Sequence, residues 1–182
     1  MRLLLFSLLA LTLPTAAPKT PSVRSESTGS AALCADMLPQ AIRSLASLAQ
    51  KTKIIFGQST EGAHAIAYLH PAGHIRAVEV TFFGESGRTM YEFYYVDGKV
   101  DLARQREFIY NAPIYMNHEL TEKIRREEGV IQEAFDDRKT KVQENLYCFG
   151  SSKPFGQKES SDPGEANVRQ ISKEAYSEFS KE

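Results

Sequence analysis

The central part of the chain alternates apolar and polar residues in four segments rich in aromatic and β-branched side chains: 63–69, 75–83, 88–96 and 99–110. This two-residue period is typical of β-strands with one buried face. Short turn sequences separate the segments: Pro71-Ala72-Gly73, Gly84-Glu85-Ser86-Gly87 and Asp97-Gly98. Because turns of this length join antiparallel neighbours, we predict a four-stranded meander.

The turn lengths also predict which residues of neighbouring strands lie opposite each other. An Asp-Gly pair favours a two-residue type I′ turn, which sets Tyr95 opposite Val100. The same reasoning, applied to all three turns, brings four apolar residues into one row: Ile66, Val78, Phe93 and Leu102. Since register decides which side chains share a face, this row predicts the buried face. The opposite face is small and partly acidic.

Segments with helical spacing or helix-capping signals flank these strands: about 36–51, 117–128 and 163 onward. Asn117 and Asp162 are favourable N-caps for the second and third helices. Residues 140–149 alternate as a further strand, and 53–56 is a short apolar piece that fits either a strand or an extended linker. The order of elements predicts an α+β domain, in which an antiparallel meander of about five to six strands has helices packed on one face.

The first residues predict an exported protein. Arg2 precedes the apolar run Leu3–Leu13, and small residues follow at 15–17, as in a secretory signal peptide occupying residues 1–17. Residues 18–32 are rich in Pro, Ser, Thr, Gly and Ala, which favours a flexible leader. The remaining residues, 33–182, have the length of a single domain, and none of their segments is apolar enough to span a membrane. We expect a periplasmic or secreted protein.

Charge and motifs argue against several functional classes. The net charge is −1 and no basic tract occurs, which disfavours binding to nucleic acid or to an anionic membrane. The chain has no G-x-S-x-G, H-E-x-x-H or C-x-x-C motif and no phosphate-binding glycine loop. We therefore predict no catalytic residue, cofactor or metal. His70 and His74 flank one turn and could share an ion, but we interpret them as a solvated hairpin tip.

The chain has two cysteines, Cys34 and Cys148. In an exported protein such a pair favours one disulfide bridge, here between the start of the first helix and a late strand. Two free thiols, or a partner thiol on another chain, are the alternatives.

The predicted register gathers polar residues where one end of the core face turns polar. His64, Tyr91, Arg104 and Arg106 occupy successive rows there, with Glu61, Glu85 and Asn111 at the rim. Two guanidinium groups beside an imidazole and a phenol are suited to a carboxylate or a phosphate. We predict a ligand-binding site at these residues. Alternatively, the arginines pair with local carboxylates, such as Glu119 or Glu122, and complete the core.

A second candidate lies on the opposite face, where Glu79 is predicted opposite Glu92. Like charges directly across a strand pair are unfavourable. Two close carboxylates can separate their pKa values and act as acid and base, or bind a metal. The alternative is two hydrated side chains that bend toward neighbouring Lys or Arg residues.

Four stretches together resemble one family of small, functionally uncharacterised exported bacterial proteins: Ser59-Thr60-Glu61-Gly62, Gly84-Glu85-Ser86-Gly87, Tyr94-Tyr95-Val96-Asp97-Gly98-Lys99 and Tyr110-Asn111-Ala112-Pro113-Ile114-Tyr115. The resemblance covers roughly residues 53–149. It departs near the end, where Cys148-Phe149-Gly150-Ser151-Ser152 replaces an Asn-Gly-Lys-type turn. The resemblance implies an extracytoplasmic bacterial protein and transfers no catalytic residue.

Three functional hypotheses follow. The leading one is an exported, non-enzymatic binding or accessory module of the envelope that holds a protein, a peptide or a small acidic ligand. The second is a hydrolase or lyase that acts on an envelope polymer with Glu79 and Glu92 as its acid–base pair. The third is an assembly protein that adds a strand to another sheet through an exposed edge.

Overall fold

The computed structural model describes residues 28–55, 62–149 and 163–180, with side chains from residue 35 onward. The expected signal peptide, the leader up to residue 27 and the predicted helix cap Asp162 lie outside these ranges.

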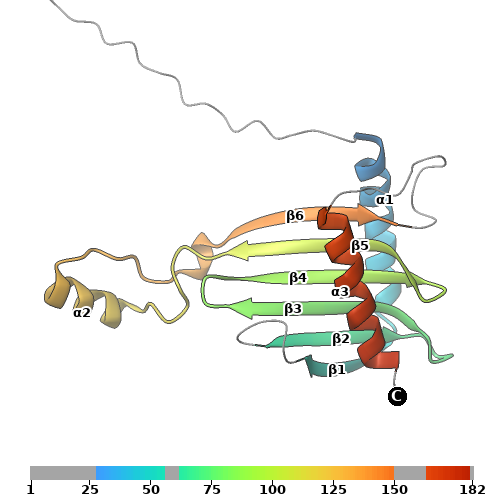
Figure 1. Ribbon diagram of the computed structural model, residues 1–182, viewed down its shortest axis with the longest axis horizontal. Helices are drawn as coiled ribbons and strands as arrows, with labels where there is room; N and C mark the ends of the chain where they lie inside the picture. The colour runs from blue at the N-terminus through green and yellow to red at the C-terminus, as the bar shows by residue number, and fades with distance from the viewer. Residues whose placement is uncertain (1–27, 56–61, 150–162, 181–182) are drawn as a thin grey trace, which may run out of the picture.

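The described residues form one antiparallel sheet of six strands in sequential order (Figure 1). The strands are β1 (Ala49–Ile55), β2 (Ala63–Leu69), β3 (Ile75–Gly84), β4 (Gly87–Val96), β5 (Lys99–Ile109) and β6 (Lys141–Cys148). The helices are α1 (Thr28–Leu45), α2 (His118–Glu128), the short 3-10 helix η1 (Asp137–Lys139) and α3 (Pro163–Ser180). The predicted α+β class and meander are confirmed. None of the described helices combines the length and apolar character that a membrane crossing needs.

The predictions that rest on local capping and turn residues are confirmed. The Asn117 side chain accepts a hydrogen bond from the Leu120 backbone N–H at 2.8 Å, and Gly129 ends α2 in the left-handed conformation with a φ of 69°. Asp97 and Gly98 both have positive φ, as a type I′ turn requires.

α1 begins and ends earlier than the predicted helix 36–51. Residues 28–32, which we expected in the leader, belong to α1, whereas residues 49–51 belong to β1. β1 pairs with β2 along its whole length. The hydrogen bonds of this strand pair therefore take the place of those that a longer helix would make.

The predicted register holds between β3 and β4. On either side of them it holds next to the turn, where Tyr95 lies opposite Val100 as predicted, and is wrong by one residue farther along the strands. Val78 lies opposite Phe93, as predicted, but their partners on β2 and β5 are Ala67 and Ala103. The predicted apolar row is therefore incorrect: Ile66 and Leu102 do not lie beside Val78 and Phe93.

Two β-bulges cause this shift. Arg76 is the extra residue on β3, and Asp101 is the extra residue on β5. The Asp101 carbonyl oxygen accepts a hydrogen bond from the Phe149 backbone N–H at 2.7 Å, which stabilises the bulge. Because one extra residue turns the side chains beyond it to the other side of a strand, β2 and the part of β5 from Leu102 onward present the opposite set of side chains to that predicted.

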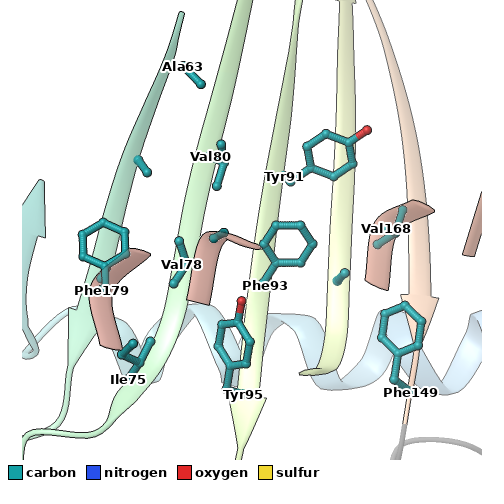
Figure 2. Close-up of a cluster of buried hydrophobic side chains, with 14 residues drawn as sticks. Ala63, Ile75, Val78, Val80, Tyr91, Phe93, Tyr95, Phe149, Val168 and Phe179 are labelled. Carbon is teal, nitrogen blue, oxygen red and sulfur yellow. The ribbon is translucent and has the colours of Figure 1, made fainter. Parts of the chain in front are cut away.

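α3 covers one face of the sheet, which we call the α3 face. The apolar stripe of α3 packs there on Val78, Phe93 and their neighbours, with Phe149 at one side (Figure 2). The Tyr95 hydroxyl, although buried, donates a hydrogen bond to the Ser172 carbonyl oxygen at 2.9 Å. This buried cluster is larger than the one on the other face of the sheet, which identifies the α3 face as the main core.

α1 lies on the other face, which we call the α1 face (Figure 1). Leu38 of α1 packs there with Tyr94, Leu102 and Cys148. The helices therefore do not share one face, as we had expected, but cover both. The physical reason is the bulge on β5, which turns Leu102 to the second face and gives that face an apolar patch for α1 to cover.

Candidate functional site

The structure separates the four residues of the first predicted site. Tyr91 lies on the α3 face, buried in the core and stacked on Phe93 with ring centroids 5.7 Å apart. His64, Arg104 and Arg106 lie on the α1 face, because the bulges turn β2 and β5 over relative to β4. The predicted grouping of these four residues on one face is therefore wrong.

Two of the three predicted rim residues, Glu85 and Asn111, lie within the described part of the chain. Glu61 lies outside the described residues. Glu85 is in the β3–β4 turn, where its carbonyl oxygen accepts a hydrogen bond from Ile114. The Asn111 side chain is occupied in holding the chain between α2 and β6: its amide donates to the Ala134 carbonyl oxygen and its oxygen accepts from the Asp136 N–H, both at 2.9 Å.

The same shift in register brings the two predicted sites together on the α1 face. One row across the sheet contains Ile66, Glu79, Glu92, Arg104 and Leu146, and the next contains His64, Thr81, Met90, Arg106 and Glu144. The guanidinium groups of Arg104 and Arg106 thus lie beside the predicted carboxylate pair. Sequence reasoning found these residues but placed them on opposite faces.

Glu92 lies at the centre of this cluster, with only 12% of its side chain exposed. Arg104 binds both carboxylate oxygens, through Nε at 2.5 Å and Nη2 at 2.7 Å, and Arg106 adds a contact from Nη2 at 2.7 Å. The Tyr94 hydroxyl donates a longer hydrogen bond of 3.3 Å. Bidentate, charge-assisted hydrogen bonds of this kind fix both geometry and charge. The expected alternative, that the arginines pair with a local carboxylate, holds with Glu92 in that role.

Glu79 is directly opposite Glu92 but has a different environment. In the part of the chain that the structure describes, no hydrogen bond or ion pair reaches its carboxyl group. Burial raises the pKa of Glu79, and the Glu92 charge raises it further, against smaller opposing effects of Arg106, His64 and Arg104. The two glutamates therefore differ: arginines bind both carboxylate oxygens of Glu92, whereas Glu79 lacks such partners and its pKa is raised.

A cavity of about 320 Å³ opens between the end of α1 and the sheet beside these glutamates. Ile42, Leu45 and Ala46 form its apolar side. Its polar side comes from Gln50, Tyr68, Glu79, Glu92, Tyr94 and Arg104. Burial raises the pKa of both Tyr68 and Tyr94 above the usual range of a phenol. An apolar wall facing a few converging polar groups is the usual composition of a small-ligand site.

The histidine pair is a closed hairpin tip. The rings of His70 and His74 stack with centroids 4.4 Å apart, and the His70 N–H donates to the His74 carbonyl oxygen at 2.9 Å. His70 Nδ1 also accepts a hydrogen bond from Ala72. Among the described residues, no group of three or more His, Cys, Asp or Glu side chains is arranged to hold a metal ion.

Cys148 is buried on the α1 face, in the cluster that contains Leu38. Cys34 is four residues before Leu38, one turn earlier on α1, and its side chain is outside the described part. This placement is compatible with the predicted bridge, which stays a prediction.

The comparisons with known proteins found no match: no family model, no curated protein and no solved structure is similar to this chain.

Proposed function

We propose that the chain is an exported, non-enzymatic binding module of the bacterial envelope, and that its ligand site is the α1-face cavity beside Glu79. Export is inferred from the signal-like residues 1–17 and from the family resemblance. The observation that carries the binding site is the unequal state of the glutamates. Glu92 has both carboxylate oxygens occupied by arginines, which leaves Glu79 as the carboxyl group available to a ligand.

This arrangement changes the expected chemistry of the ligand. Arg104 and Arg106, on which we based a small acidic ligand, are already bound to Glu92. Glu79 instead favours a ligand with a hydrogen-bond donor, such as an amide, an amine or a sugar hydroxyl. The apolar wall of α1 would cover the body of that ligand, and Gln50 would provide a second polar contact.

The test is affinity capture from a native envelope extract with matched variants of the mature, oxidised protein. Ala46 is exposed and lines the cavity, so Ala46→Trp fills the cavity mouth without touching the core. Ala35→Trp adds the same bulk to an exposed position of α1 away from the cavity. We expect the wild type and Ala35→Trp to recover the same ligand, identified by mass spectrometry, and Ala46→Trp to lose it. Equal recovery by all three proteins would exclude this site.

The second candidate is a hydrolase or lyase that acts on an envelope polymer. This candidate is supported by the two glutamates that face each other. Glu79 has a raised pKa, and Glu92 directly opposite is held by arginines. Two carboxyl groups in unequal environments are typical of acid–base pairs. The cavity also supplies the hollow surface that such a pair requires. Glu79→Gln should then abolish the release of soluble fragments from purified envelope polymer. If the variant releases as much as the wild type, Glu79 has no catalytic role.

A further inference from the structure

A second cavity lies on the α3 face, and neither Glu79 nor Glu92 lines it. It has a volume of about 620 Å³ and is enclosed by the β4–β5 hairpin on one side and by α3 on the other. This volume is within the range of small-molecule sites. The hairpin turn approaches α3 closely beside this cavity: a Cβ atom placed on Gly98 would be 3.2 Å from the Tyr176 hydroxyl.

The floor of this cavity is aromatic and rigid. The rings of Tyr95 and Tyr176 are 4.9 Å apart at their centroids, and Val100 and Ala166 add apolar surface. Tyr95 is fixed by its hydrogen bond to the Ser172 carbonyl oxygen, and the Ser172 hydroxyl donates back to Tyr95 at 3.1 Å. A preformed apolar floor of this kind lowers the entropic cost of binding.

The rim of the cavity is cationic. Lys99 from the hairpin and Lys173 from α3 both line it and are exposed, and Arg169 lines it one turn earlier on α3. Arg169 is held by Glu165 at 2.9 Å and lies over the Phe149 ring, so its position is fixed and part of its charge is compensated. No lining residue of this cavity in the described part is acidic. The electrostatic preference is therefore for an anion, although the whole chain has a net charge of −1.

We propose that this cavity is a binding site for a small amphipathic anion. The apolar body of the ligand lies on Tyr176, Val100 and Ala166, and its carboxylate or phosphate head pairs with Lys99 and Lys173. Exposed ion pairs contribute little by themselves. The affinity therefore depends on burying the apolar body, and the two lysines add selectivity for negative charge.

Decanoate is a suitable probe, with decanol as its uncharged counterpart. We expect a titration followed by amide chemical shifts in NMR to give saturable binding of decanoate. The perturbed residues should be confined to Gly98–Val100 and to residues 166–176 of α3. Decanol should bind more weakly. Shifts that map to the α1-face cavity, shifts scattered over the surface, or no saturable binding would each overturn the proposal.

Two double variants distinguish an effect of the rim lysines on binding from an effect of the total charge of the protein. Lys99→Gln with Lys173→Gln should weaken decanoate binding about tenfold and leave decanol binding unchanged. Lys123→Gln with Lys141→Gln removes the same charge from exposed positions on α2 and β6 and should leave both ligands unaffected. All four residues are exposed, so the fold is preserved. Equal effects of the two double variants would overturn the proposal. The outcome is independent of the function proposed for the α1 face.

Discussion

The two faces of this sheet are built from the same strands, but they bury different kinds of side chain. On the α3 face, apolar residues of β2, β3 and β4, together with Ala103 of β5, form the main core, and α3 covers them (Figure 2). On the α1 face, the row that ends at Cys148 is apolar and covered by α1, whereas the next row contains two glutamates and an arginine. One face therefore stabilises the fold, and the other combines a smaller core with partly buried charge.

The comparison shows how a sheet can carry a polar site without losing stability. Buried charges are costly unless they are paired and hydrogen-bonded. Glu92 meets this condition through Arg104 and Arg106, but Glu79 does not. The main core on the α3 face stabilises the protein, and this stabilisation offsets the cost of partly burying the unpaired carboxyl group of Glu79. Four changes test this division between the faces, from the largest expected effect to the smallest.

Phe93→Ala should cause the largest loss, because Phe93 is fully buried at the centre of the α3 face. Removing a buried phenyl ring costs about 3–5 kcal/mol through lost burial and the cavity left behind. Urea denaturation followed by circular dichroism measures the change in the free energy of unfolding. Ile54→Ala, at an exposed position of the α1 face, should stay within about 0.5 kcal/mol. Similar losses for both variants would contradict the assignment of the main core.

Loss of the predicted Cys34–Cys148 bridge should have the next largest effect. The bridge would tie α1 to β6, and removing a disulfide from a small exported domain typically costs about 2–5 kcal/mol. Alkylation with and without reductant, followed by mass spectrometry, detects the bridge. Reductant should lower the melting temperature of the wild type and leave Cys34→Ser unchanged. An alkylated wild type without reductant would show that no bridge forms.

Glu92→Gln should destabilise the protein by about 2 kcal/mol, because it leaves the guanidinium groups of Arg104 and Arg106 without their carboxylate. Glu107→Gln makes the same chemical change at an exposed position of β5 and should be nearly neutral. Urea denaturation of both variants gives the comparison. A neutral Glu92→Gln would show that the arginine contacts contribute no net stability.

Glu79→Gln should have the smallest effect and a dependence on pH. A carboxyl group whose pKa is raised in the folded state costs nothing when it is protonated in both states, and destabilises the fold once pH rises above its unfolded pKa. Replacing Glu79 by Gln should therefore leave stability unchanged near pH 3 and increase it at pH 7. Melting curves at the two pH values measure this. A variant less stable than the wild type at pH 7 would mean that the Glu79 carboxylate is stabilising.

Most elements of this fold were predictable because their signals are local. The Asp97-Gly98 turn, the Asn117 cap and the β3–β4 register each depend on residues within a few positions of one another. Alternation of apolar residues likewise predicted the boundaries of β2 without error. The residues of the α1-face site were also recognised, since paired glutamates and closely spaced arginines on neighbouring strands are visible in the sequence.

The grouping of those residues was not predictable, since it depends on two single-residue bulges. Nothing in the local sequence marks Arg76 or Asp101 as extra residues. The bulge at Asp101 is held by Phe149, which lies far along the chain. The sequence by itself thus determined which segments are strands and helices. Only tertiary packing decided which face each side chain joins, because a shift of one residue reverses the two faces of a strand while leaving its hydrogen bonds nearly unchanged.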